Sequence, residues 1–154
     1  RPFWSDVRGA SDAARIDPLL LAALMRRESR FEASARSAVG ALGLFQIMPY
    51  TAAEIGPALG LDVKTEERVL QPAVNAAIAA SLVARLHRLF GTALSPLIAS
   101  YNAGEDRVGD WWRASRDVPD DLFVELIPYA ETRGFVREVY TNYQTYRRVY
   151  ANGN

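Results

Sequence analysis

Residues 17–49 read DPLLLAALMRRESRFEASARSAVGALGLFQIMP, and the rest of the chain is interpreted outward from this stretch. Its first half predicts a helix, because Asp17 can cap the N-terminus and Pro18 suits the first helical position, where its missing N–H costs nothing. Apolar residues recur three and four positions apart along this helix and form one face directed at a core. These residues are Leu21, Leu24, Met25 and Phe31.

Glu28 falls on this apolar face, since it lies seven residues after Leu21 and four after Leu24. Burying an ionised carboxylate is costly, so we expect the pKa of Glu28 to be raised. A raised pKa is what a general acid needs near neutral pH. The alternative is a glutamate at the edge of the face, paired with Arg27 or another cation.

The second half of the stretch, residues 37–49, predicts a loop with two glycines followed by a short apolar run that contains one amide. Glycines permit positive φ and close backbone approach, so the segment can fold back over the end of the first helix. It would then present Ser37, Gln46 and Met48 beside Glu28. Hydroxyl and amide groups in such a place indicate a polar, uncharged ligand such as a sugar.

The bulk composition limits the class of protein. A chain of 154 residues is long enough to bury a sizeable core, and we expect residues 1–154 to form one domain, excised from a longer chain. The formal net charge of +0 gives no electrostatic reason to expect binding to nucleic acid or to an anionic membrane. No apolar run approaches the length of a membrane span.

Cofactor and metal chemistry find no support in the sequence. The chain has no cysteine, which excludes thiol chemistry and disulfides. Its only histidine, His87, has no partner ligands near it in the sequence and is assigned to the surface or to packing. We therefore expect no cofactor and no metal.

Helical patterns dominate the rest of the chain and strand signals are almost absent, which predicts a compact all-α fold of roughly seven helices around one core and one substrate groove. The expected helices cover residues 3–15, 17–28, 49–59 (with a break at 56–57), 72–90, 95–104, a segment around 111–112, 119–126 and 128 onward. Residues 61–70 are charged and irregular and are assigned to a solvated loop.

Two details of these helices are also predicted. Ser95 and Pro96 would start a helix by the same pattern of cap and proline as Asp17 and Pro18. The helix over 72–90 and the last helix would each bury one apolar stripe. The stripes comprise Val74, Ile78, Leu82, Leu86 and Leu89 in the first, and Phe135, Val136, Val139, Tyr140 and Tyr143 in the second.

Four motifs, in this order, resemble those of the soluble lytic transglycosylases. They are Glu28-Ser29, residues 43–49 (GLFQIMP), residues 100–104 (SYNAG) and residues 127–133 (IPYAETR). The similarity covers residues 3–150 and is greatest to the catalytic domain of the large soluble members, which have a lysozyme-like fold. The chain departs from the family pattern at Phe45, where Met is common, and at Ser100, where Ala is usual.

The resemblance implies cleavage of the β-1,4 bond between N-acetylmuramic acid and N-acetylglucosamine in the glycan strands of peptidoglycan, with formation of 1,6-anhydromuramic ends. Glu28 would protonate the glycosidic oxygen and then, as a carboxylate, accept the proton of the C6 hydroxyl that attacks C1. The N-acetyl group of the substrate would assist, so no second carboxylate is needed. This fits the residues, because Glu32 is expected in solvent and Glu131 at the start of a helix, where the dipole favours its ionised form.

The same resemblance implies roles for six further residues. Tyr101 would form a hydrogen bond to Glu28, and Met48 would pack on the saccharide. The residues expected to contact N-acetyl groups and sugar hydroxyls are Ser37, Gln46 and Asn102, and Glu131 would support the groove near the cleaved bond. The Trp111-Trp112 pair is assigned mainly to packing. A periplasmic location is implied by the resemblance alone.

Two other functions remain open at this stage. A hydrolase of related fold, similar to goose-type lysozyme, would also place one glutamate at a helix end but would deliver water to C1. A catalytically silent helical module could instead bind glycan strands or partner proteins. A plain helical scaffold is disfavoured, because it would leave Ser37, Gln46, Tyr101 and Asn102 as polar groups without a purpose.

Overall fold

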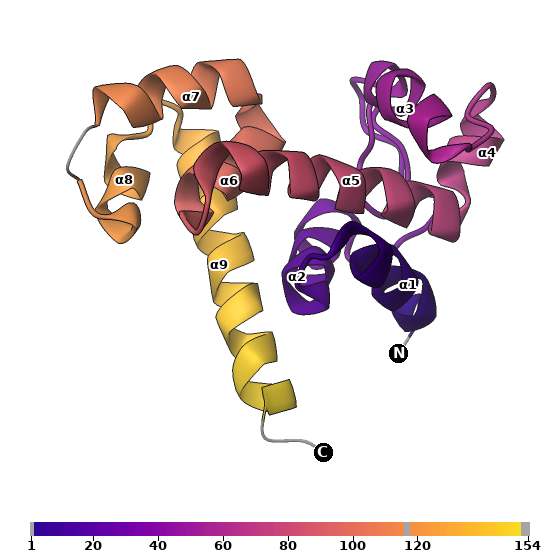
Figure 1. Cartoon of the computed structure of the whole chain (residues 1–154), viewed down its shortest axis with the longest axis horizontal. Coiled ribbons are helices and arrows are strands. Elements are labelled where there is room, and N and C mark those ends of the chain that lie inside the picture. Colours follow the sequence, from indigo (N-terminus) through magenta and orange to yellow (C-terminus); the bar gives the residue numbers. More distant parts are fainter. Residues whose placement is uncertain (1, 116–117, 152–154) are drawn as a thin grey trace. The chain divides into compact units, whose positions relative to one another are not determined.

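The computed structural model of the chain describes residues 2–115 and 118–151. These residues form α-helices and one short 3₁₀ helix, with two isolated β-bridges and no strand among them, so the predicted all-α fold is confirmed (Figure 1). The helices are α1 (Trp4–Ala14), α2 (Pro18–Ser29), α3 (Pro49–Ile55), η1 (Pro57–Leu59), α4 (Glu66–Leu70), α5 (Pro72–Phe90), α6 (Leu94–Ala103), α7 (Glu105–Ala114), α8 (Asp120–Leu126) and α9 (Ala130–Ala151).

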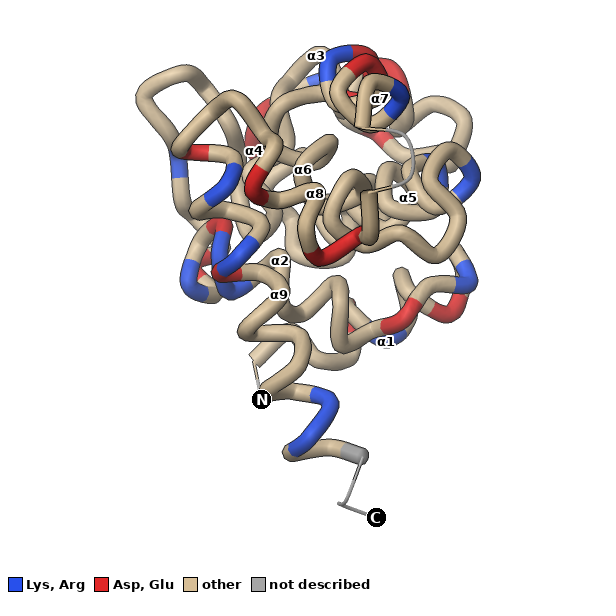
Figure 2. Tube along the Cα trace, turned by 90° about the vertical axis from the view of Figure 1, so that its left-hand side faces the viewer, with Lys and Arg blue, Asp and Glu red and all other residues tan. Residues whose placement is uncertain are grey.

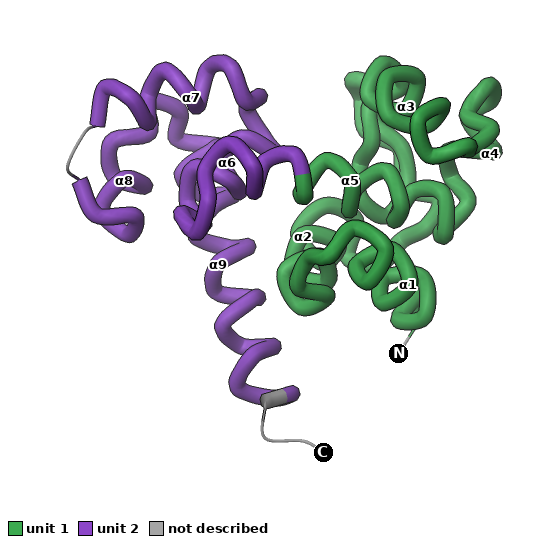
Figure 3. Tube along the Cα trace, viewed as in Figure 1, with its two compact units in different colours: residues 1–84 green, residues 85–154 purple. Residues whose placement is uncertain are grey.

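The chain divides into two compact units, which Figure 3 shows in green and purple. Unit 1 comprises Arg1–Ala84 and unit 2 comprises Arg85–Asn154. The boundary lies within α5, so the first part of this helix belongs to unit 1 and its last turns to unit 2.

In unit 1, α2 begins as its sequence predicts. The carboxylate of Asp17 accepts a hydrogen bond of 2.8 Å from the backbone N–H of Leu19, and Pro18 occupies the first helical position. Leu21, Leu24 and Met25 are buried, and α2 packs against α1. The expected apolar face therefore forms the centre of this unit. Phe31 is only half-buried, because the helix ends before it.

Unit 2 is arranged around α6, which packs against α7, α8 and α9. Its N-terminus is capped differently from the prediction. The two carboxylate oxygens of Asp120, the first residue of α8, accept hydrogen bonds of 3.0 and 2.9 Å from the backbone N–H groups of Leu94 and Ser95. Ser95 lies inside the first turn and is buried, so the cap comes from a side chain 25 residues away.

The assignment of residues 61–70 to a loop was wrong for its second half, which forms α4. The hydroxyl of Thr65 accepts a hydrogen bond from the backbone N–H of Arg68, which caps the helix. Glu66 and Glu67 lie in the first turn, where the helix dipole favours negative charge, and Val69 is buried. Local capping thus stabilises a single helical turn that carries one buried apolar residue.

Two residues assigned to buried stripes are exposed. Leu89 on α5 is 57% exposed and Tyr140 on α9 is 40% exposed. With 3.6 residues per turn, Tyr140 lies roughly a quarter of a turn from the centre of the stripe that is buried on α9. Leu89 points in the same direction as Ile78 and Leu86 but lies in the last turn of α5. Those stripes include Ile78, Val83 and Leu86 on α5, and Phe135, Val136, Val139 and Tyr143 on α9.

The charged residues do not form a one-signed field. Figure 2 shows Lys and Arg in blue and Asp and Glu in red, interspersed along the trace. Across the two described ranges, no helix combines the length and apolar character needed to cross a membrane.

Candidate active site

Glu28 lies in the last turn of α2, at a point where the chain turns sharply. The two residues after the helix, Arg30 and Phe31, have φ values of 52° and 69°, a left-handed conformation that is unfavourable for residues with a side chain. Glu28 is half-buried, and no ion pair involving it occurs within the described part of the chain. The alternative of a glutamate paired with Arg27 at the edge of the face is therefore not supported.

Burial raises the pKa of Glu28 from 4.5 to about 7, and the positive charge of Arg27 opposes this shift only in part. The predicted raised pKa is confirmed. A carboxyl with this pKa is present in both its protonated and its ionised forms near neutral pH, so it can give a proton in one step and accept one in the next.

This pKa predicts that the stability contributed by Glu28 falls as the pH rises. Between pH 4.5 and about 7 the folded protein keeps a proton that the unfolded chain has lost. The stabilisation is therefore fully present below pH 4.5 and is lost as the pH passes through 7. The shift from 4.5 to about 7 corresponds to at most roughly 3 kcal/mol at pH 8.

Glu28→Gln should accordingly be more stable than the wild type at pH 8, because its amide is uncharged, and the gain should shrink towards pH 5. Urea midpoints of both proteins at the two pH values measure the difference. Glu32→Gln serves as the control, since Glu32 is exposed and hydrogen bonds from Ser34 lower its pKa. A gain for Glu28→Gln of the same size at both pH values would contradict the prediction.

The loop between α2 and α3 carries Ser37 and Gln46, and much of their hydrogen bonding is internal to it. The hydroxyl of Ser37 accepts a hydrogen bond of 2.9 Å from the backbone N–H of Ala41. The side-chain N–H₂ of Gln46 donates to the carbonyl oxygens of Gly43 (2.9 Å) and Ala35 (3.4 Å). Because both partners are acceptors, the nitrogen of the Gln46 amide must face the loop. Its oxygen has no hydrogen-bond partner among the described residues and is open to a donor.

A residue that sequence reasoning missed, Asn75 of α5, fixes this loop in unit 1. Its side chain is fully buried and makes three hydrogen bonds. Its oxygen accepts from the backbone N–H of Phe45 (2.8 Å), and its nitrogen donates to the carbonyls of Leu42 (3.0 Å) and Val69 (2.9 Å). Gly43 has φ +75°, and a Cβ there would lie 2.7 Å from the Asn75 amide nitrogen. This position therefore requires glycine.

Unit 2 contains a cavity of about 500 Å³ where α6 ends and α9 begins. Asn102 and Glu131, both predicted to bind substrate, line it. The side-chain oxygen of Asn102 accepts a hydrogen bond of 2.8 Å from the hydroxyl of Thr132, so its amide nitrogen is directed elsewhere. Thr132 belongs to the IPYAETR motif but was not assigned a role from the sequence.

Met48 is the half-buried N-cap residue of α3, and Tyr101 is half-buried in α6. The expected hydrogen bond from Tyr101 to Glu28 would join the two units and stays a prediction. The structure thus brings Ser37 and Gln46 together in one loop, and Asn102 and Glu131 around one cavity. No group of three or more potential metal ligands occurs in the parts of the chain described.

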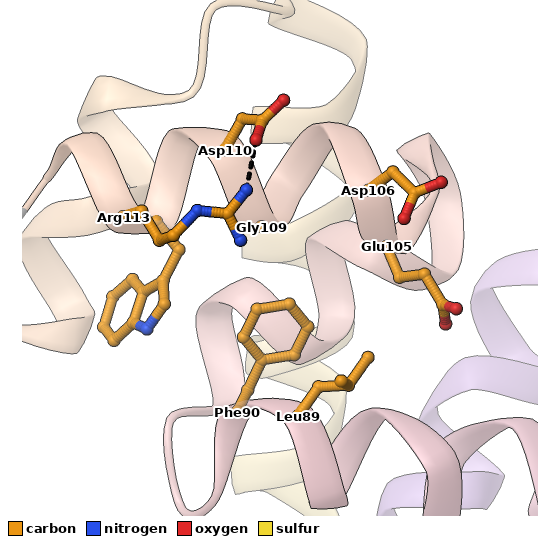
Figure 4. Close-up of a pocket in the computed structure, with 8 residues that line it drawn as sticks. Leu89, Phe90, Glu105, Asp106, Gly109, Asp110 and Arg113 are labelled. Atoms are coloured by element: carbon orange, nitrogen blue, oxygen red, sulfur yellow. Dashed lines mark hydrogen bonds and ion pairs between the residues drawn. The ribbon is translucent and has the colours of Figure 1, made fainter.

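A second cavity of unit 2, of about 400 Å³, contains none of the predicted site residues. It lies between the end of α5 and α7, and Figure 4 shows Leu89 and Phe90 facing it from α5. On α7, the guanidinium of Arg113 points to the carboxylate of Asp110, with which it forms an ion pair.

The fold and the site define a helical domain with a half-buried glutamate of raised pKa, and comparison with known proteins identifies its family. The sequence profile described as Transglycosylase SLT domain matches residues 6–124. The chain belongs to this family. It is 38% identical over 128 residues to the soluble lytic murein transglycosylase of Salmonella typhimurium, an alignment that covers 82% of this chain and 20% of that protein.

Solved structures extend the match to the fold. An inactive mutant of the lytic transglycosylase Slt from Pseudomonas aeruginosa superimposes with a TM-score of 0.89 and 29% identity, over 97% of this chain and 24% of that one. The 70 kDa soluble lytic transglycosylase of Escherichia coli superimposes with a TM-score of 0.88 and 31% identity, over 94% of this chain and 24% of that one. The lysozyme-like helical fold is thereby confirmed. The chain spans about a fifth of the length of the curated relative it matches.

Proposed function

We propose that this chain is a single catalytic domain of a peptidoglycan lytic transglycosylase. It cleaves the β-1,4 bond between N-acetylmuramic acid and N-acetylglucosamine and leaves 1,6-anhydromuramic ends. The observation that carries the proposal is Glu28, whose pKa is raised to about 7 by burial, in a chain that belongs to the transglycosylase family. The substrate lies outside the cytoplasmic membrane, so we also infer a periplasmic location.

The reaction needs only one proton carrier. Protonated Glu28 donates its proton to the glycosidic oxygen as the bond from that oxygen to C1 breaks, and the N-acetylglucosamine side leaves. The resulting carboxylate accepts the proton of the C6 hydroxyl while its oxygen bonds to C1 of the muramic acid ring. The proton count balances, no water is consumed, and Glu28 returns to its starting form. The N-acetyl group of the substrate assists at C1 between these steps.

Hydrogen-bonding capacity supports the substrate roles of Gln46 and Asn102. Each amide has one half bonded within the protein, which leaves an oxygen acceptor on Gln46 and nitrogen donors on Asn102. An N-acetyl group offers one N–H donor, which suits the oxygen of Gln46, and one carbonyl acceptor, which suits the nitrogen of Asn102. Each amide can therefore bind an N-acetyl group within its own unit. Ser37 donates its hydroxyl hydrogen to a sugar oxygen. Glu131 accepts from sugar hydroxyls, Met48 packs on a ring face and Tyr101 orients Glu28.

Product masses test this function. Digestion of purified peptidoglycan should release muropeptides whose muramic acid end is lighter by one water than a reducing end, because the C6 oxygen replaces water. Mass spectrometry of the digest distinguishes the two ends. Reducing ends would favour a hydrolase like goose-type lysozyme, and binding to glycan strands without any product would favour a silent binding module.

A further inference from the structure

We propose that Arg107 makes the enzyme prefer glycan strands whose attached peptides carry free carboxylates, by binding one such carboxylate at the cavity of unit 2. This inference rests on the proposed function and adds a determinant of specificity to it. The cavity is the one lined by Asn102 and Glu131, and Arg107 of α7 contributes a cation to the same wall.

The guanidinium of Arg107 is held in place by its surroundings. Its central carbon lies 5.3 Å from the centroid of the Tyr129 ring, and one nitrogen donates weakly to the carbonyl oxygen of Ala103 at 3.4 Å. The Tyr129 ring in turn makes an edge-to-face contact with Trp111, with centroids 5.1 Å apart. An arginine stacked on an aromatic face keeps its planar fork oriented and loses less freedom when it binds an anion.

No carboxylate among the described residues forms an ion pair with the guanidinium of Arg107. Three other arginines of unit 2 form ion pairs: Arg85 with Glu105, Arg113 with Asp110, and Arg137 with Glu125. Arg107 forms none within 4.0 Å among the described residues, although Glu131 lines the same cavity. An oriented guanidinium with open donors at a cavity is matched by a carboxylate, which it can bind through two parallel hydrogen bonds.

The chemistry of the substrate indicates which carboxylate this is. The amide-substituted sugar rings of a strand are uncharged, so a cation gains little from them beyond ordinary hydrogen bonds. The peptides attached to the lactyl group of muramic acid carry free carboxylates, and these are the anions that a strand presents beside its sugars. A cavity that binds the sugar through Asn102 and the peptide through Arg107 would recognise both parts of one repeating unit.

The test compares wild type and Arg107→Gln on two forms of one substrate, soluble peptide-bearing tetrasaccharides and the same compounds with their peptide carboxylates converted to amides. We expect Arg107→Gln to lower kcat/KM about fivefold on the untreated form, and amidation to lower that of the wild type by a similar factor. On the amidated form the two enzymes should be equal. Arg107→Lys should keep part of the preference, since it keeps the charge but not the fork.

Arg113→Gln is the matched control, because it removes the same charge from the same helix but at the other cavity (Figure 4). Its kcat/KM should equal that of the wild type on both forms of the substrate. Equal losses for Arg107→Gln on both forms would overturn the inference, since the contact would then not depend on the carboxylate. An unchanged rate on both forms would overturn it as well. Inactive wild type on both forms would instead refute the proposed function, so the two failures are distinguishable.

Discussion

Replacing Glu28 by Gln is expected to lower the rate of glycan cleavage by about 10³-fold or more, because the proposed mechanism assigns both proton transfers to this side chain and general acid–base catalysis contributes roughly 10²- to 10⁴-fold. The amide has the shape of the protonated carboxyl but can neither give up nor accept a proton in the required steps. Clearing of turbid suspensions of purified cell walls measures the rate, and mass spectrometry of the released ends identifies the residual product.

The design of this experiment separates chemistry from folding. The same variant is expected to be more stable than the wild type at pH 8, so lost activity cannot be attributed to unfolding. Glu32→Gln again provides the matched control, since this residue lies four positions further along, is exposed and is held ionised by Ser34. It should clear cell walls at the wild-type rate. Undiminished clearing by Glu28→Gln would exclude Glu28 as the proton carrier.

Those parts of the fold that depend on local chemistry could be predicted from the sequence. The start of α2 follows from the side-chain oxygen of Asp17 and the ring of Pro18, which act within two residues of each other. The start of α6 could not be predicted in the same way. Its cap is Asp120, 25 residues after Ser95 in the chain. Ser95, which the sequence pattern predicted as the cap, is buried in the first turn of the helix. A pattern of residue types does not say which distant carboxylate reaches a helix end.

The same distinction applies to the candidate site. The raised pKa of Glu28 could be predicted, because helical periodicity alone places it on the apolar face of α2. The partners of Gln46 could not, since they are carbonyl groups that become available only in the folded loop. That Arg107 has no ion pair among the described residues could not be predicted, because the sequence does not distinguish paired from unpaired arginines. Ion pairing is a property of tertiary neighbours.

Asn75→Leu is expected to destabilise the protein by about 3 to 5 kcal/mol, the largest stability change predicted for this chain. The side chain is fully buried, and its replacement removes the hydrogen bonds to the N–H of Phe45 and to the carbonyl of Val69. It also removes one of the two hydrogen bonds that the carbonyl of Leu42 accepts, the other coming from the backbone N–H of Ile47. Each stranded buried group costs about 1 to 3 kcal/mol, and leucine of similar size offers no hydrogen bond in return. Urea unfolding at pH 7 gives the free energy of unfolding directly.

Asn142→Leu is the control, because Asn142 also lies on a helix, α9, and its buried amide nitrogen makes no hydrogen bond to any described residue. It should cost little. A loss below about 1 kcal/mol for Asn75→Leu would contradict the view that this amide holds the loop together. The expected large loss would instead link stability to function. Asn75 closes the turn at Gly43 to which Gln46 is bonded, so the loop cannot loosen without displacing the amide that is proposed to meet the sugar.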